Sequence, residues 1–127
     1  YLVRGYALGS LVDVGLRSDI PPQEMLDFYH SRLKKERSLF CRLSIFKVLY
    51  RLGEHQYLKE IFRFLSYKYY RLRIAAANTL SEIVNESNYA EIEQAVLPAL
   101  QIEKLRSVSG AMKNLLKRKE DIFPPTE

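Results

Sequence analysis

The chain has 127 residues, of which 47% are apolar and 28% charged, and its net charge is +5. This is enough for one globular domain with its own core. A single cysteine, Cys41, excludes an internal disulfide and favours a reducing, cytoplasmic setting. No apolar run approaches the roughly 18 residues of a membrane helix, so we expect no membrane partner. Because the chain starts without methionine, we expect it to be part of a longer protein.

The first predicted helix spans residues 2–15 and shows a pattern that recurs along the chain. Counted from Arg4, apolar residues occupy offsets of minus one, three, seven and ten, which trace one stripe of an α-helix. The pattern recurs from Arg42, from Arg73 and, with valine in place of arginine, from Val108, at spacings of 38, 31 and 35 residues. These copies predict three further helices, over 38–53, 70–85 and 105–118.

Three amphipathic segments also lie between these copies, over residues 21–35, 55–68 and 88–103. The first begins at paired prolines, which suit a helix start. The third places Asn88 and Glu91 at the spacing of a capping box and contains Pro98, which we expect to bend its helix. The apolar residues of the first two segments are Met25, Leu26, Phe28, Tyr29 and Leu33, then Leu58, Ile61, Phe62 and Leu65.

The alternation of two helix types predicts an all-α fold. Two helices for every 35 residues or so indicate an α-solenoid of about three and a half helix pairs, or about seven helices, over residues 1–118. Residues 119–127 then form a C-terminal tail, which we expect to be extended, with Ile122 and Phe123 covering the last repeat. We interpret the run of three alanines, 75–77, as small spacers that let neighbouring helices approach closely.

The stretches "LRIAAANTLSEIV", "LVRGYALGSLVDVG" and "VLPALQ" resemble the HEAT-repeat family, in particular short bacterial repeats. The resemblance covers almost all of residues 1–118. It implies a repeated helix pair whose second helix lines a concave binding face and starts with an arginine that makes contacts between repeats. The aspartate that commonly precedes that arginine is missing here, and the fourth copy lacks the arginine itself.

A row of candidate partner residues follows from this repeat. Side chains five and nine positions after each origin should point away from the buried stripe, towards a protein partner, although such a row can also be a merely solvated face. Tyr50 and Arg51 are the residue types expected at an interface hot spot. The candidate residues are Asp13, Lys47, Tyr50, Arg51, Asn78, Glu82, Lys113 and Lys117.

The segment 62–73, "FRFLSYKYYRLR", interleaves aromatic and basic residues and allows a second interpretation. Residues 32–73 hold twelve Lys or Arg against three acids, whereas residues 74–103 hold five glutamates and neither cation. Lys68, Arg71 and Arg73 are therefore candidate anion contacts, through which the chain could bind nucleic acid. The structural alternative places Tyr69 in the core, Lys68 and Arg71 in an inter-helix turn, and Arg73 in a contact between repeats.

Catalytic signatures are missing from the sequence. It contains two histidines on separate segments, no glycine-rich phosphate loop, no metal-ligand cluster and no nucleophile elbow, and Cys41 falls on the apolar stripe. We therefore expect neither enzyme activity nor a cofactor or metal. The leading hypothesis is a protein-binding module, either an adaptor or scaffold domain or a small bacterial inhibitor of the immunity-protein type. Self-association through open solenoid ends is a further expectation.

Overall fold

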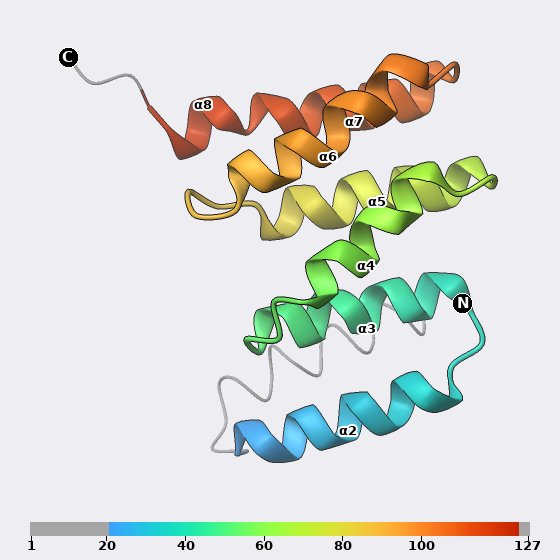
Figure 1. Ribbon diagram of the computed structural model, residues 1–127, viewed down its shortest axis with the longest axis vertical. Coiled ribbons are helices and arrows are strands. Elements are labelled where there is room, and N and C mark those ends of the chain that lie inside the picture. Colours follow the sequence, from blue (N-terminus) through green and yellow to red (C-terminus); the bar gives the residue numbers. More distant parts are fainter. Residues whose placement is uncertain (1–20, 125–127) are drawn as a thin grey trace. The chain divides into compact units, whose positions relative to one another are not determined.

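The computed structural model describes residues 21–124, and every regular element in this range is helical (Figure 1). The chain divides into two compact units, with the boundary between Glu60 and Ile61. We call them unit 1 and unit 2. The predicted all-α class is confirmed for the described range. The predicted helix over 2–15 and its candidate Asp13 lie outside the described residues.

Unit 1 contains helix α2 (Pro22–Lys35), helix α3 (Leu39–Arg51) and the start of helix α4 (Tyr57–Arg63). Helices α2 and α3 run antiparallel and pack together (Figure 1). The helix α2 starts at a proline, as predicted. The N-cap of α3 is Ser38, whose side chain accepts a hydrogen bond from the Cys41 N–H. The core of this unit consists of Met25, Tyr29, Ile45, Val48 and Leu49, with Leu26, Leu33, Leu52 and Tyr57 packed against it.

The end of α3 is set by Gly53, which has a φ of 104°. In this left-handed conformation the chain turns back, so that the Glu54 N–H donates to the Leu49 carbonyl at 3.0 Å. Glycine reaches this region without a steric penalty, whereas a residue with a Cβ would be strained. The turn allows Tyr57 to return and pack onto the core of unit 1.

Unit 2 begins within α4 and continues through the short 3-10 helix η1 (Phe64–Ser66). The remaining elements are α5 (Tyr70–Ile83), α6 (Tyr89–Ile102), α7 (Arg106–Lys117) and α8 (Lys119–Ile122). The helix α5 packs against η1 and α7, and α6 packs against the same two elements. Helices α5 and α7 run in the same direction, and α6 runs opposite to both (Figure 1). Within unit 2, the parallel helices α5 and α7 are therefore neighbours, and α6 lies against both α7 and η1.

The apolar stripe predicted for the second helices is confirmed on α3 and α5. On α7, Leu115 is buried as predicted, but the rest of the buried side consists of Val108, at the arginine position, and Met112. Cys41 is a buried free thiol at its predicted stripe position. On α5, Ala76 and Ala77 are fully buried where this helix meets its neighbours, as expected of small residues at a close approach. The buried stripe residues are Cys41, Ile45 and Leu49 on α3, Leu72, Ala76, Leu80 and Ile83 on α5, and Leu115 on α7.

Several local predictions are wrong. Asn88 is the N-cap of α6, but its side chain makes no cap hydrogen bond. Its amide group instead donates to the Ile83 carbonyl and so stabilises the turn that precedes α6. Residues 119–122 form a helical turn rather than an extended tail, although Phe123 does contact the Tyr89 ring. On α2, the side that meets α3 includes Met25 and Tyr29, and the neighbouring Phe28 is about half exposed.

Candidate functional site

The predicted row of partner residues can be followed on three helices. On α5 and α7, Asn78, Glu82, Lys113 and Lys117 are all exposed, beside a stripe that is almost completely buried. On α3, Arg51 is exposed, whereas Lys47 and Tyr50 are half-buried. The Tyr50 ring lies 5.2 Å from the ring of His55, so this side chain already has one intramolecular contact. The row therefore offers an accessible polar surface on each of these three helices.

Arg73 lies at the centre of a polar cluster in unit 2. Its Nε and Nη2 atoms donate to the two carboxylate oxygens of Glu103 at 2.7 and 3.1 Å. Its Nη1 atom donates to the carbonyls of Tyr67 and Lys68 at 2.8 and 2.9 Å. Planar two-point pairing of this kind is the geometry in which arginine binds a carboxylate most strongly. These contacts favour a structural role for Arg73 over the anion-contact role considered for it.

Glu103 is held in its ionised form by this arrangement. Its side chain is 5% exposed, and besides Arg73 it accepts a hydrogen bond from the Leu105 N–H at 3.1 Å. The hydrogen bond from Arg73 lowers the pKa of the Glu103 carboxyl, against the opposing effect of burial. Glu103 lies just after α6, thirty positions beyond Arg73, and the repeat pattern contained no signal for the pairing.

The same repeat position in unit 1 holds Arg42. Its Nη1 atom donates to the carbonyls of Leu33, in the last turn of α2, and of Glu36, in the turn before α3, at 3.0 and 3.2 Å. Its guanidinium lies 5.7 Å from the centre of the Phe46 ring, a cation–π distance. Both described arginines of the repeat thus bind the turn that precedes their own helix.

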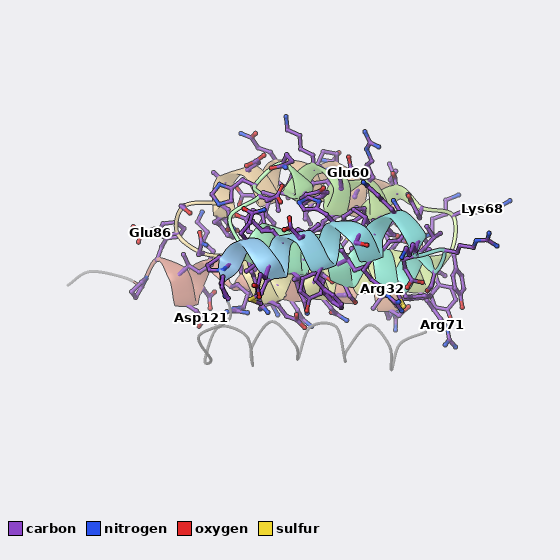
Figure 2. All side chains as sticks on the ribbon, turned by 90° about the horizontal axis from the view of Figure 1, so that it is seen from below. Arg32, Glu60, Lys68, Arg71, Glu86 and Asp121 are labelled. Atoms are coloured by element: carbon purple, nitrogen blue, oxygen red, sulfur yellow. The ribbon has the colours of Figure 1, made fainter. Side chains whose placement is uncertain are left out.

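One end of unit 2 gathers exposed basic and aromatic side chains from the start of α5. Tyr69 is 48% exposed, so its predicted place in the core is wrong, and Arg71 lies in the first helical turn rather than in the inter-helix turn. The rings of Tyr69 and Tyr70 meet edge to face at 5.7 Å. The Nε atom of Arg71 donates to the Tyr70 hydroxyl at 3.2 Å, which raises the pKa of the arginine. In Figure 2, Lys68 and Arg71 extend from this end of the molecule.

The turn between α6 and α7 adds further side chains at this end. Lys104 and Arg106 are exposed, as are Leu105 and, to 76%, Ile102. Sequence reasoning missed these residues because it treated the fourth copy only as a looser version of the pattern. Superimposing the copies would have provided a signal, since Arg71 and Arg106 both stand two positions before their origins.

A polar contact in unit 1 joins two elements but forms no metal centre. His30 Nε2 contacts Glu54 Oε1, and Gln56 donates to the other oxygen of the same carboxylate at 2.8 Å. Within residues 21–124, no group of three His, Cys, Asp or Glu side chains is arranged to hold a metal ion. None of the helices in this range combines the length and apolar character needed to cross a membrane.

Comparisons with known proteins leave the family open. The chain matches no protein-family model, no curated protein and no solved structure. The functional argument therefore depends on the geometry of the described residues.

Proposed function

We propose that the chain is a non-catalytic protein-binding module, built as a solenoid of HEAT-like helix pairs. Two features of the described residues support the repeat. In unit 2, α5 contacts α7, the helix at the same place in the next predicted pair, and η1 contacts α6. In addition, Arg42 and Arg73 occupy the same position of the sequence pattern, and each donates to two backbone carbonyls that precede its own helix, one of them six residues before the arginine in both cases. Stacked repeats of this kind present extended surfaces that suit protein partners.

The observation that carries the proposal is the exposed row beside the buried stripe. Asn78 and Glu82 on α5, and Lys113 and Lys117 on α7, are accessible although both helices bury their apolar side almost completely. Within unit 2 the row changes sign, with a glutamate on α5 and two lysines on α7. A mixed row favours a protein partner with complementary charges over a uniformly anionic one.

The proposal covers an adaptor or scaffold domain and a small inhibitor of the immunity type, both in the cytoplasm. The buried free thiol of Cys41 suits a reducing compartment. The two forms differ in affinity, because an inhibitor needs a tightly packed hot spot. On the row, Tyr50 and Arg51 are the residues best suited to provide one.

The experiment first uses the chain to capture a partner protein from a lysate. The affinity between the purified chain and the purified partner is then measured. A captured protein is titrated calorimetrically against the wild-type chain and against a Lys47→Glu, Arg51→Glu variant. We expect one-to-one binding that survives high salt and weakens at least tenfold in the variant, since interface charge reversals typically cost more than about 1.4 kcal/mol. The matched control, Arg37→Glu with Lys59→Glu, makes the same charge change at exposed positions off the row. Equal losses in both variants would refute the placement of the interface.

A further inference from the structure

The exposed end of unit 2 joins two turns that are far apart in the sequence. Arg73 binds the carbonyls of Tyr67 and Lys68 in one turn and the carboxylate of Glu103 in the other. This bridge brings the starts of α5 and α7 together, and the two helices run in the same direction from it (Figure 1). We call this surface the basic end; it consists of Lys68, Tyr69, Tyr70, Arg71, Ile102, Lys104, Leu105 and Arg106.

Two of the charges of the basic end, Arg71 and Arg106, do not serve the stability of the helices that carry them. The start of a helix carries a partial positive charge of about half a unit, which favours acids and disfavours cations. Neither α5 nor α7 has an acid in its first turn, yet Arg71 and Arg106 lie there. The nearby carboxylate, Glu103, is already bound by Arg73. Two labelled acids of unit 2, Glu86 and Asp121, lie at the opposite end (Figure 2). The basic end is therefore a surface of one sign that an anionic partner would neutralise.

The aromatic and aliphatic side chains narrow the choice of anion. Tyr69 and Tyr70 expose ring surface in two nearly perpendicular planes, 81° apart. Ile102 and Leu105 are exposed at the same end. A free phosphate or a duplex backbone would contact only the cations and leave these apolar surfaces in water. A single-stranded nucleic acid offers phosphates and unstacked flat bases together.

We propose that the basic end of unit 2 binds single-stranded nucleic acid, independently of the protein-binding row. Lys68, Arg71, Lys104 and Arg106 contact phosphates. Tyr69 and Tyr70 stack on bases, and Ile102 covers the apolar edge of a neighbouring base. Arg73 contacts no nucleotide; it positions the two turns through Glu103 and the carbonyls.

The test is fluorescence anisotropy with the full chain and a labelled oligothymidylate of about 20 nucleotides, compared with a duplex of the same length. We expect the single strand to bind more tightly than the duplex. Four phosphate contacts on a single strand predict that affinity falls about fifty-fold between about 50 and about 200 mM salt. Replacing Tyr69 and Tyr70 by alanine should weaken binding by about five- to 150-fold for each base that stacks.

A charge-reversed pair distinguishes this surface from the net charge of the chain. Lys68→Glu with Arg71→Glu should abolish binding, whereas Arg37→Glu with Lys59→Glu, an equal charge change at exposed positions of unit 1 outside both proposed surfaces, should largely preserve it. All four positions are exposed, so thermal unfolding should show that both variants fold. The proposal is overturned by equal losses in the two variants, by no oligonucleotide binding at about 50 mM salt, or by binding only to polyglutamate or to vesicles containing phosphatidylserine.

Discussion

The two units use the same arginine in different ways. Arg42 and Arg73 both bind two backbone carbonyls that precede their helix. Beyond this shared contact, Arg42 lies near the Phe46 ring, whereas Arg73 pairs with the buried carboxylate of Glu103. The backbone contacts belong to the repeat itself. The additional partner depends on which residues the packing of each unit brings close.

The buried stripe differs between the units as well. Three positions after the arginine, unit 1 has Ile45 and unit 2 has Ala76, and both are fully buried. The same register therefore accommodates a large side chain in one unit and a small one in the other. This requires the neighbouring elements to be spaced differently, because protein interiors are densely packed.

The largest effects should come from exchanging these stripe residues. We expect Ile45→Ala to cost about 2–5 kcal/mol of unfolding free energy by leaving a cavity. We expect Ala76→Ile to cost about 1–3 kcal/mol by overpacking the contact of α5 with its neighbours. Urea denaturation followed by circular dichroism measures both. A neutral Ala76→Ile would show that this site has free space and would remove the spacer interpretation.

The next largest losses of unfolding free energy should come from replacing Arg73 and Arg42, and the loss should be larger for Arg73. Arg73→Met leaves Glu103 buried without its cation and should cost about 3 kcal/mol. Arg42→Met loses two hydrogen bonds to carbonyls and should cost about 1–2 kcal/mol. The double variant Arg73→Met with Glu103→Gln should recover part of the larger loss. If both single variants cost the same, the carboxylate contributes nothing beyond the backbone contacts.

Acid should weaken the stabilising contribution of the Arg73–Glu103 ion pair, because Glu103 becomes protonated. Its pKa in the folded chain lies below the ordinary value of 4.5, so the unfolded chain takes up the proton first as the pH falls. The pair therefore contributes its full stability above about pH 4.5, and the contribution is lost as the pH drops through the folded pKa. Melting temperatures of wild type and Glu103→Gln should converge over this window. If the melting temperatures of the two proteins fall in parallel as the pH is lowered, the stability that is lost in acid does not come from Glu103.

The smallest effects should come from two glycines, with opposite signs. Gly53 in unit 1 has a φ of 104°, so Gly53→Ala should destabilise the chain by about 1 kcal/mol. Gly110 lies inside α7, where an added Cβ would meet no atom within 4 Å. Gly110→Ala should therefore stabilise the chain by about 0.5–1 kcal/mol. Thermal melts of the two variants should shift in opposite directions.

The pattern along the chain by itself determined the helix type, the approximate helix limits and the buried stripe. These follow from local rules, because apolar residues three and four positions apart share one side of a helix, and because proline and serine suit helix starts. The stripe from Leu72 to Ile83 and the buried thiol of Cys41 were predicted in this way.

Only the tertiary structure decided how the turns and surfaces combine. In the structure, Tyr69 lies at the surface and not in the core where it was predicted. Arg73 pairs with a glutamate thirty positions away, and Arg106 lies at the same end of unit 2 as Arg71. Periodicity identifies the residues that share one side of a single helix. It contains no information on which neighbour that side meets, because that depends on the packing of side chains that are distant in the sequence.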